Sequence, residues 1–169
     1  MSIESVINQS LDLIGYKRHI GSIWDGSPAA RIALNAYAET RDEVLAAAPW
    51  DFARSFLLLE TAPQLPPPTW LFAYARPTSA ITLLDVFPGE PDRLDPQPSV
   101  WIEATVPERT IFTRFPEACA AITKRITDTT LWSPEFTLAV IRGLAEKLQR
   151  GLTGAAPKEQ QDESRGHRQ

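Results

Sequence analysis

Apolar side chains recur at steps of three and four residues in three stretches of this chain. The stretches are residues 2–14, 28–48 and 134–154. Residues at this spacing share one face of an α-helix, so each stretch is predicted to form an amphipathic helix. Ser2 is placed to cap the first helix, and Gly15 is placed to end it in a left-handed conformation.

The second and third helices have the same start signal, a serine followed by a proline. Ser27 and Ser133 can each accept a hydrogen bond from a free N–H group of the first helical turn. Pro28 and Pro134 then occupy the first helical position, where no N–H group is required. Both helices are therefore predicted to start at these prolines.

The second helix is predicted to end at Ala48, because Pro49 disfavours helical geometry in the residue before it. Trp50, Asp51 and Phe52 follow directly. We expect Trp50 and Phe52 to fold back under the helix and to be largely buried against it.

Apolar, β-branched and aromatic residues between the second and third helices indicate strands. A buried strand is predicted over residues 55–61, and further strands over 80–86, 100–106 and 110–113. Residues 117–126 fit both an alanine-rich helix and a strand with alternating faces, of which we favour the strand.

These elements predict an α+β fold in one domain. Residues 1–154 are expected to form an antiparallel bundle of about three helices with a small antiparallel β-sheet. The connector of residues 16–26 is short enough to make the first two helices antiparallel neighbours. Nine of the fifteen prolines lie between residues 63 and 98, so this section is expected to be rich in loops. Residues 155–169 contain no large apolar side chain and are expected to form a flexible C-terminal tail.

The composition narrows the class of protein. The 169-residue chain has a net charge of −4 and no basic stripe, which disfavours a DNA-binding regulator. The mild negative charge would instead repel DNA that passes by. No apolar run approaches about 18 residues, so no membrane-spanning helix is expected. The single cysteine, Cys119, leaves no internal disulfide.

The sequence motifs of common enzymes are missing. His19 and His167 form no metal-binding pair, and the scattered glycines form no phosphate-binding loop. We therefore expect no metal, no cofactor and no enzyme activity. The alternative is a cell-wall or polysaccharide hydrolase, which needs two carboxylates across a cleft. The sequence offers three pairs for it: Asp42 with Glu43, Glu90 with Asp92, and Glu103 with Glu108.

Five tryptophans are spread one to each junction between segments: Trp24, Trp50, Trp70, Trp101 and Trp132. Each is expected to anchor a loop to the core, since a large aromatic side chain buries much surface. Tryptophan is also enriched at protein interfaces, so one or two of the five are expected to face a neighbouring subunit.

Several short motifs follow one another in a characteristic order and spacing. They are Leu13-Ile14-Gly15, residues 24–31, Tyr37 with 40–45, residues 49–53, residues 70–77, Thr127-Asp128 with 131–136, and Ala145 with 152–154. In this order the chain resembles the head-to-tail adaptor proteins of tailed phages, the group of tail tubular protein A and the tail accessory factors. The resemblance covers residues 3–154, and residues 49–53 are its most specific block. Family members often continue with another long helix where this chain has only a short tail.

The resemblance implies a ring of subunits, typically twelve, docked under the portal protein and above the next tail component, the nozzle. DNA would pass through the centre without sequence-specific binding, and no membrane would be involved. The protein would be made in the cytoplasm of the bacterial host and would reside in the virion, at the head–tail junction. It would be a structural protein with no chemistry of its own. The resemblance also supports a strand over residues 117–126.

Related adaptors use extended C-terminal segments to dock on the portal. The resemblance therefore implies that the tail of this chain contacts the portal, where its bases would pair with acids and its acids with bases. The docking candidates are Lys158, Glu159, Asp162, Glu163, Arg165 and Arg168.

Overall fold

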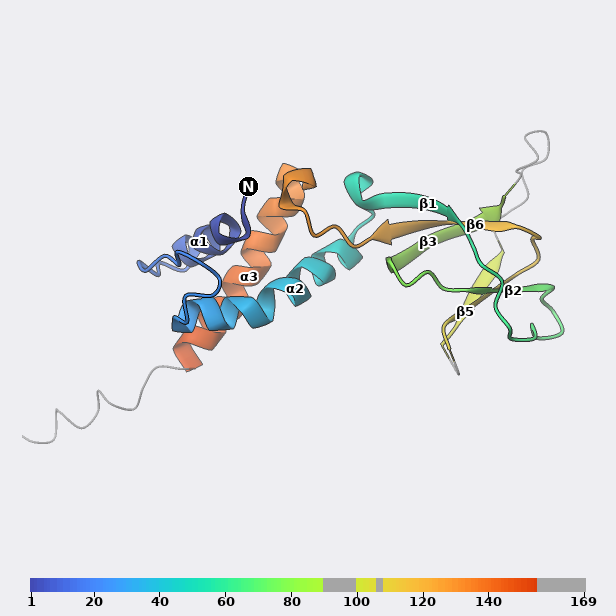
Figure 1. Ribbon diagram of the computed structural model, residues 1–169, viewed down its shortest axis with the longest axis horizontal. Helices are drawn as coiled ribbons and strands as arrows, with labels where there is room; N and C mark the ends of the chain where they lie inside the picture. The colour runs from blue at the N-terminus through green and yellow to red at the C-terminus, as the bar shows by residue number, and fades with distance from the viewer. Residues whose placement is uncertain (90–99, 106–107, 155–169) are drawn as a thin grey trace, which may run out of the picture. The chain divides into compact units, whose positions relative to one another are not determined.

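The computed structural model describes residues 1–89, 100–105 and 108–154 (Figure 1). These residues group into two compact units. Unit 1 contains Met1–Val44 and the described residues from Asp128 onward, and unit 2 contains Leu45–Thr127. The helices are α1 (Ile3–Leu13), α2 (Pro28–Ala47) and α3 (Pro134–Gly154). The strands are β1 (Arg54–Leu58), β2 (Phe72–Ala75), β3 (Ala80–Pro88), β4 (Trp101–Ala104), β5 (Thr110–Thr113) and β6 (Ala118–Lys124).

The helix starts agree with the sequence prediction. The Ala30 N–H donates to Ser27 Oγ at 3.2 Å, and the Phe136 N–H donates to Ser133 Oγ at 3.2 Å. Pro28 and Pro134 are the first residues of α2 and α3. The two serine–proline start signals are therefore confirmed.

The first helix is also bounded as predicted. Ser2 Oγ accepts a hydrogen bond from the N–H group of Ser5, which satisfies one free donor of the first turn. At the other end Gly15 has a φ of +72°, the left-handed conformation in which glycine carries no steric penalty. The N–H group of Tyr16 then donates to Leu11, which closes the helix end.

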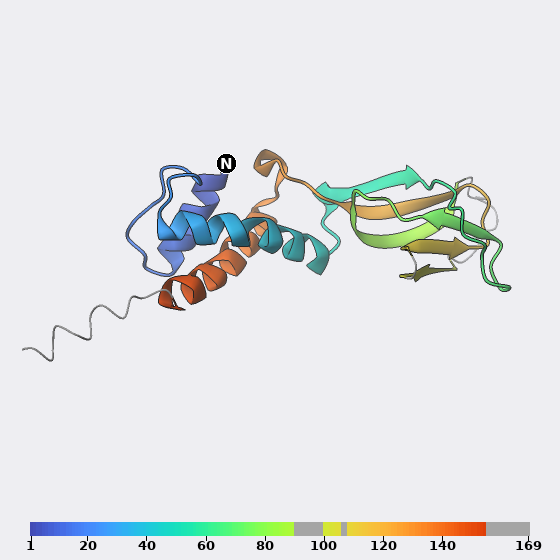
Figure 2. The ribbon, with the colours of Figure 1, turned by 60° about the horizontal axis from the view of Figure 1, so that its bottom comes forward.

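The three helices do not form the antiparallel bundle that the sequence predicted. In unit 1, α1 packs along α3 rather than along α2, so the prediction that the first two helices are antiparallel neighbours is wrong. In Figures 1 and 2, α2 crosses α3. Glycines allow this close crossing, because a Cβ atom at Gly143 would lie 3.0 Å from Thr40 Cγ2, and one at Gly151 would lie 2.9 Å from Ile32 Cγ2.

Unit 2 contains two three-stranded antiparallel sheets instead of the single small sheet that was predicted. Sheet A has the strand order β1-β6-β3, and sheet B has the order β2-β5-β4. The fold is therefore α+β, but with two sheets and no helical bundle. Figure 2 shows the two sheets one over the other.

The sequence prediction assigns no strand to residues 72–75, which lie in the proline-rich section, and therefore lacks β2 of the second sheet. Phe72–Ala75 nevertheless alternates aromatic residues with alanines, and its Tyr74 is buried. The Tyr74 hydroxyl donates to the carbonyl oxygen of Phe115 at 2.9 Å, and β2 pairs with β5 in antiparallel register. This long-range pairing outweighs the local proline signal.

Residues 118–124 form a strand, as favoured from the sequence. This strand, β6, is the centre of sheet A, and its Ala118, Ala120 and Ile122 are fully buried. They lie in one hydrophobic core with Val86 from the same sheet and Ile111 from sheet B. The two sheets therefore share a core, which positions the outward-facing residues described below.

Candidate functional site

The block Trp50-Asp51-Phe52 forms a short turn at the end of α2. Asp51–Ala53 is a single 3₁₀ turn, and the centroids of the Trp50 and Phe52 rings lie 6.4 Å apart. Both side chains are of intermediate exposure, neither fully buried nor exposed, so the prediction that they are largely buried is met only in part. Trp50 and Phe52 are two residues apart in the sequence, and the turn brings their rings next to each other.

The portal-docking candidates cannot be placed in the same way. Lys158, Glu159, Asp162, Glu163, Arg165 and Arg168 all lie outside the described residues. Their role stays a prediction.

Trp24 has the most exposed aromatic side chain among the described residues. It keeps 75% of its surface exposed, although the tryptophans were expected to anchor loops. Trp132 by contrast keeps only 8% exposed and packs edge-on against Phe136, with ring centroids 4.9 Å apart. The two tryptophans of unit 1 therefore have opposite roles, one in the core and one at the surface.

The loop that carries Trp24 is held by its own hydrogen bonds. The carboxylate of Asp25 accepts from the Ser27 N–H at 2.9 Å and from the Gly21 N–H at 3.2 Å. Hydrogen bonds from Ser27 hold the pKa of Asp25 below its usual value. The next residue, Gly26, has a φ of +74° and completes the turn.

A second set of hydrogen bonds ties the connector to α1. The side-chain amide of Asn8 donates to the Ile20 carbonyl at 3.0 Å, and its oxygen accepts from the Ile20 N–H at 2.9 Å. Ile20 itself is buried. Trp24 is therefore presented on a loop anchored at both ends.

An open hollow of about 440 Å³ lies between the start of α3 and the N-terminal residues of unit 1. Trp132 and Ile141 contribute buried apolar surface to it, and Leu138 is 45% exposed. Gln9 and Thr137 add polar groups, and none of the lining residues has a charged side chain. The hollow is suited to an uncharged, mainly apolar group.

The outer face of sheet A is a second surface, on which Phe56, Leu58, Phe87 and Cys119 are apolar. Asp85, the cross-strand partner of the buried Ala121, lies on the same face. Cross-strand partners share a face, and the register pairs Leu58 with Cys119 and Cys119 with Phe87. The rings of Phe56 and Phe87 lie 6.3 Å apart, edge to face. Phe56 keeps 66% of its surface exposed and Leu58 keeps 62%, whereas Leu59 keeps 5%. The prediction of a buried strand over residues 55–61 is therefore wrong for the outward-facing positions.

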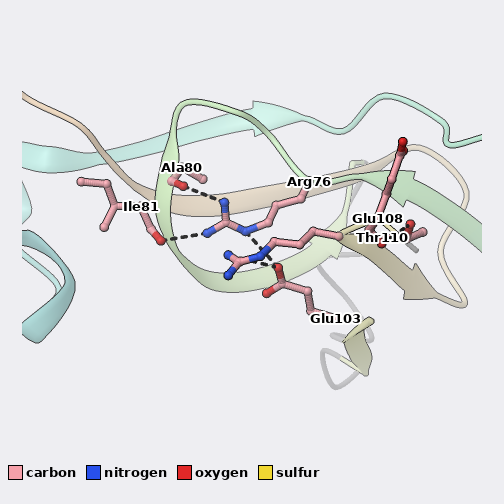
Figure 3. A network of polar contacts seen from close by, with 7 residues as sticks. Arg76, Ala80, Ile81, Glu103, Glu108 and Thr110 are labelled. Carbon is pink, nitrogen blue, oxygen red and sulfur yellow. Dashed lines mark hydrogen bonds and ion pairs between the residues drawn. The ribbon is translucent and has the colours of Figure 1, made fainter. Parts of the chain in front are cut away.

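An arginine links the two sheets of unit 2 (Figure 3). The Arg76 guanidinium donates to the carbonyl oxygens of Ala80 and Ile81 in β3, at 2.7 and 2.8 Å. Its Nε lies 2.9 Å from Glu103 Oε1 in β4. This last contact is an ion pair without hydrogen-bond alignment, since neither atom has a hydrogen-bond partner. Arg109 lies further away, 3.9 Å from the same oxygen.

Those carboxylates considered for a hydrolase that the structure describes contact basic or amide side chains. Glu103 faces Arg76. Figure 3 shows the carboxylate of Glu108 pointing away from the carboxylate of Glu103. Glu108 accepts from the Gln64 amide at 3.5 Å. Glu90 and Asp92 lie outside the described residues.

The pair on α2 is engaged in the same way. Asp42 contacts Arg41 at 2.7 Å, and Glu43 contacts Lys147 of α3 at 2.8 Å. Glu39 also contacts Lys147, at 3.1 Å. Burial lowers the pKa of Lys147, but the hydrogen bonds and charges of the two glutamates outweigh it and raise that pKa.

In the part of the chain that the structure describes, no group of three or more His, Cys, Asp or Glu side chains could hold a metal ion. No helix among residues 1–89, 100–105 and 108–154 is both long and apolar enough to span a bilayer. Comparison with models of known protein families and with curated proteins finds no match to this chain.

Proposed function

We propose that this chain is a structural virion protein that forms a ring and joins the portal to the tail, with DNA passing through the ring. The sequence motifs described above support this proposal. The observation that carries it is the outer face of sheet A, where Phe56 and Leu58 stand 66% and 62% exposed in neighbouring outward positions of one strand.

An exposed apolar face of this kind is typical of a protein that works by assembly. Adjacent apolar side chains on a free surface mark an interaction site more often than scattered ones do. β1 is moreover an edge strand of sheet A, and edge strands are sites where further chains can add. An adaptor of the proposed kind needs surfaces for the portal, for its lateral copies and for the next tail component.

The hydrolase alternative lacks a supporting observation of this kind. Among the described carboxylates considered for it, Asp42, Glu43 and Glu103 contact Arg41, Lys147 and Arg76. Their positions are explained by these ion pairs.

The test is assembly with the portal protein encoded in the same genome. The two proteins are co-expressed, and the complex is sized and imaged by electron microscopy. We expect a ring bound to the portal in a near-integer ratio, and the same ratio by mass spectrometry of disassembled virions. A chain that neither binds the portal nor occurs in virions would rule the adaptor role out.

A matched pair of variants tests the role of the sheet face. Phe56→Glu places a charge on the outer face of sheet A and is expected to weaken ring or portal assembly. Leu65→Glu is the control, because Leu65 is 92% exposed in a loop of the same unit. It is expected to assemble like the wild type.

A further inference from the structure

The geometry points to a knob-and-socket contact between copies of this chain: we propose that Trp24 of one copy inserts into the hollow formed by Trp132, Leu138 and Ile141 of the next. The inference rests on the proposed ring-forming function and names the residues that would make the lateral contact.

The first observation is that Trp24 is exposed but pre-organised. Its 75% exposed side chain is carried by a loop that Asp25, Ser27 and Asn8 hold in place. Binding through such a residue loses little conformational entropy, because the loop is already fixed before binding. Tryptophan is enriched among the residues that dominate protein interfaces, because it supplies a large contact area at a low cost in conformational entropy.

The second observation is that the hollow has room for an indole and a lining of suitable chemistry. Its volume of about 440 Å³ falls within the roughly 300–1,000 Å³ of pockets that hold small organic groups. Trp132, Leu138 and Ile141 supply apolar surface for the ring. The indole N–H needs one acceptor, and the hydroxyl of Thr137 or the amide oxygen of Gln9 can supply it.

The third observation is the placement of the two features. The connector between α1 and α2 lies at one end of unit 1, and the segment leading into α3 lies at the other (Figures 1 and 2). A copy therefore does not fill its own hollow, consistent with the exposure of Trp24. A contact between different surfaces of identical chains is heterologous, and heterologous contacts build rings or chains.

The proposal is tested by sedimentation velocity over a range of concentrations, on the full-length chain and two variants. Trp24→Ala removes the knob, and Leu138→Glu places a charge in the socket. Leu138 is 45% exposed, so its replacement leaves the core intact. Each variant is expected to weaken self-association at least about tenfold, the effect of losing one hot-spot contact.

The control is Leu34→Glu, at an exposed leucine of α2 that does not line the hollow. It is expected to associate like the wild type. Thermal melts of all variants check that they are folded to the same extent.

Mixing the two variants gives the sharpest outcome. The knob-less copy keeps its socket and the socket-less copy keeps its knob, so an equimolar mixture is expected to form a one-to-one dimer and nothing larger. Growth beyond a dimer in the mixture, or wild-type association by the Trp24→Ala variant, would overturn the proposed contact.

Portal binding tests the proposed function separately from the knob-and-socket contact. If the Trp24→Ala variant assembles on the portal like the wild type, the knob-and-socket contact is ruled out and the adaptor role is not. If the wild-type chain stays monomeric at all concentrations and does not bind the portal, both the contact and the adaptor role are ruled out.

Discussion

Arg76 and Glu103 form the ion pair that joins the two sheets of unit 2, with Nε and Oε1 2.9 Å apart. The pair is largely buried, with side-chain exposures of 12% and 24%. The same guanidinium also satisfies two carbonyl oxygens of β3. Removing the Arg76 guanidinium therefore leaves the Glu103 carboxylate without its nearest counter-ion and the carbonyl oxygens of Ala80 and Ile81 without this donor.

The first prediction follows from this pair. Arg76→Met is expected to lower the free energy of unfolding by about 2–4 kcal/mol, because a mostly buried charge loses its counter-ion. Arg109→Ala removes an arginine that is 60% exposed and 3.9 Å from the same oxygen. This control is expected to cost at most about 1 kcal/mol. Urea denaturation measures both, and equal effects would show that Arg76 does not link the sheets.

The second prediction compares two tryptophans. Trp132 is buried and stacks on Tyr37 with centroids 6.3 Å apart, so Trp132→Ala is expected to cost about 3–5 kcal/mol. Trp50 is only half-buried. Trp50→Ala is expected to cost about half as much, since the cost scales with the apolar area removed from water. A larger loss at Trp50 than at Trp132 in thermal melts would contradict this order.

Local signals predicted the helices well. The serine–proline starts and Gly15 act within one helical turn, so Ser27 and Ser133 could be assigned as caps without any knowledge of the fold. The alternation in residues 117–126 likewise identified β6. Each of these features depends on near neighbours in sequence.

The arrangement of the elements depends on contacts that the sequence does not reveal. The α2–α3 crossing follows from Gly143 and Gly151, which look like ordinary helix-weakening glycines in the sequence. β2 exists because Tyr74 finds Phe115 forty-one residues away. The exposure of Trp24 has only a weak signal, its place beside Asp25-Gly26 in a turn, and the exposure of Phe56 and Leu58 is hidden in a continuous apolar run.

The third prediction concerns the two helix caps. Ser27→Ala and Ser133→Ala are each expected to cost about 1 kcal/mol, because each removes a hydrogen bond of 3.2 Å to a first-turn N–H group. The matched replacements Ser27→Gly and Ser133→Gly are expected to cost only a few tenths of a kcal/mol. Guanidinium denaturation of the four variants gives the comparison. Alanine variants as stable as the wild type would show that the caps contribute nothing.

The fourth prediction tests the α2–α3 crossing. Glycine to alanine within a helix normally stabilises by about 0.5–1 kcal/mol. At Gly151 the new Cβ would lie 2.9 Å from Ile32 Cγ2, and a β-branched side chain in a helix has little freedom to move away. Gly151→Ala is therefore expected to destabilise the protein by about 1 kcal/mol, since overpacking outweighs the helix propensity.

A change at Ile32 tests whether its close approach to residue 151 causes the destabilisation. In an Ile32→Ala background the same Gly151→Ala change is expected to stabilise by about 0.5–1 kcal/mol, because the clashing methyl group is gone. Unfolding free energies of the two single variants and the double variant complete the cycle. The same sign of the Gly151→Ala effect in both backgrounds would rule out the clash.

The last prediction concerns residues 155–169, which follow directly on α3. Their composition is polar, with charges that cancel, and includes the docking candidates Lys158, Glu159, Asp162, Glu163, Arg165 and Arg168. A segment of this kind cannot form its own core, but it can order on a partner that supplies new contacts. Deleting residues 156–169 is therefore expected to leave the melting temperature of the monomer nearly unchanged and to weaken co-sedimentation with portal rings. A control that deletes only residues 166–169 keeps five of the six candidates and is expected to retain most of the binding. Equal binding by the wild type and the long deletion would discard the docking role, and a large drop in melting temperature would show that the tail packs on its own chain.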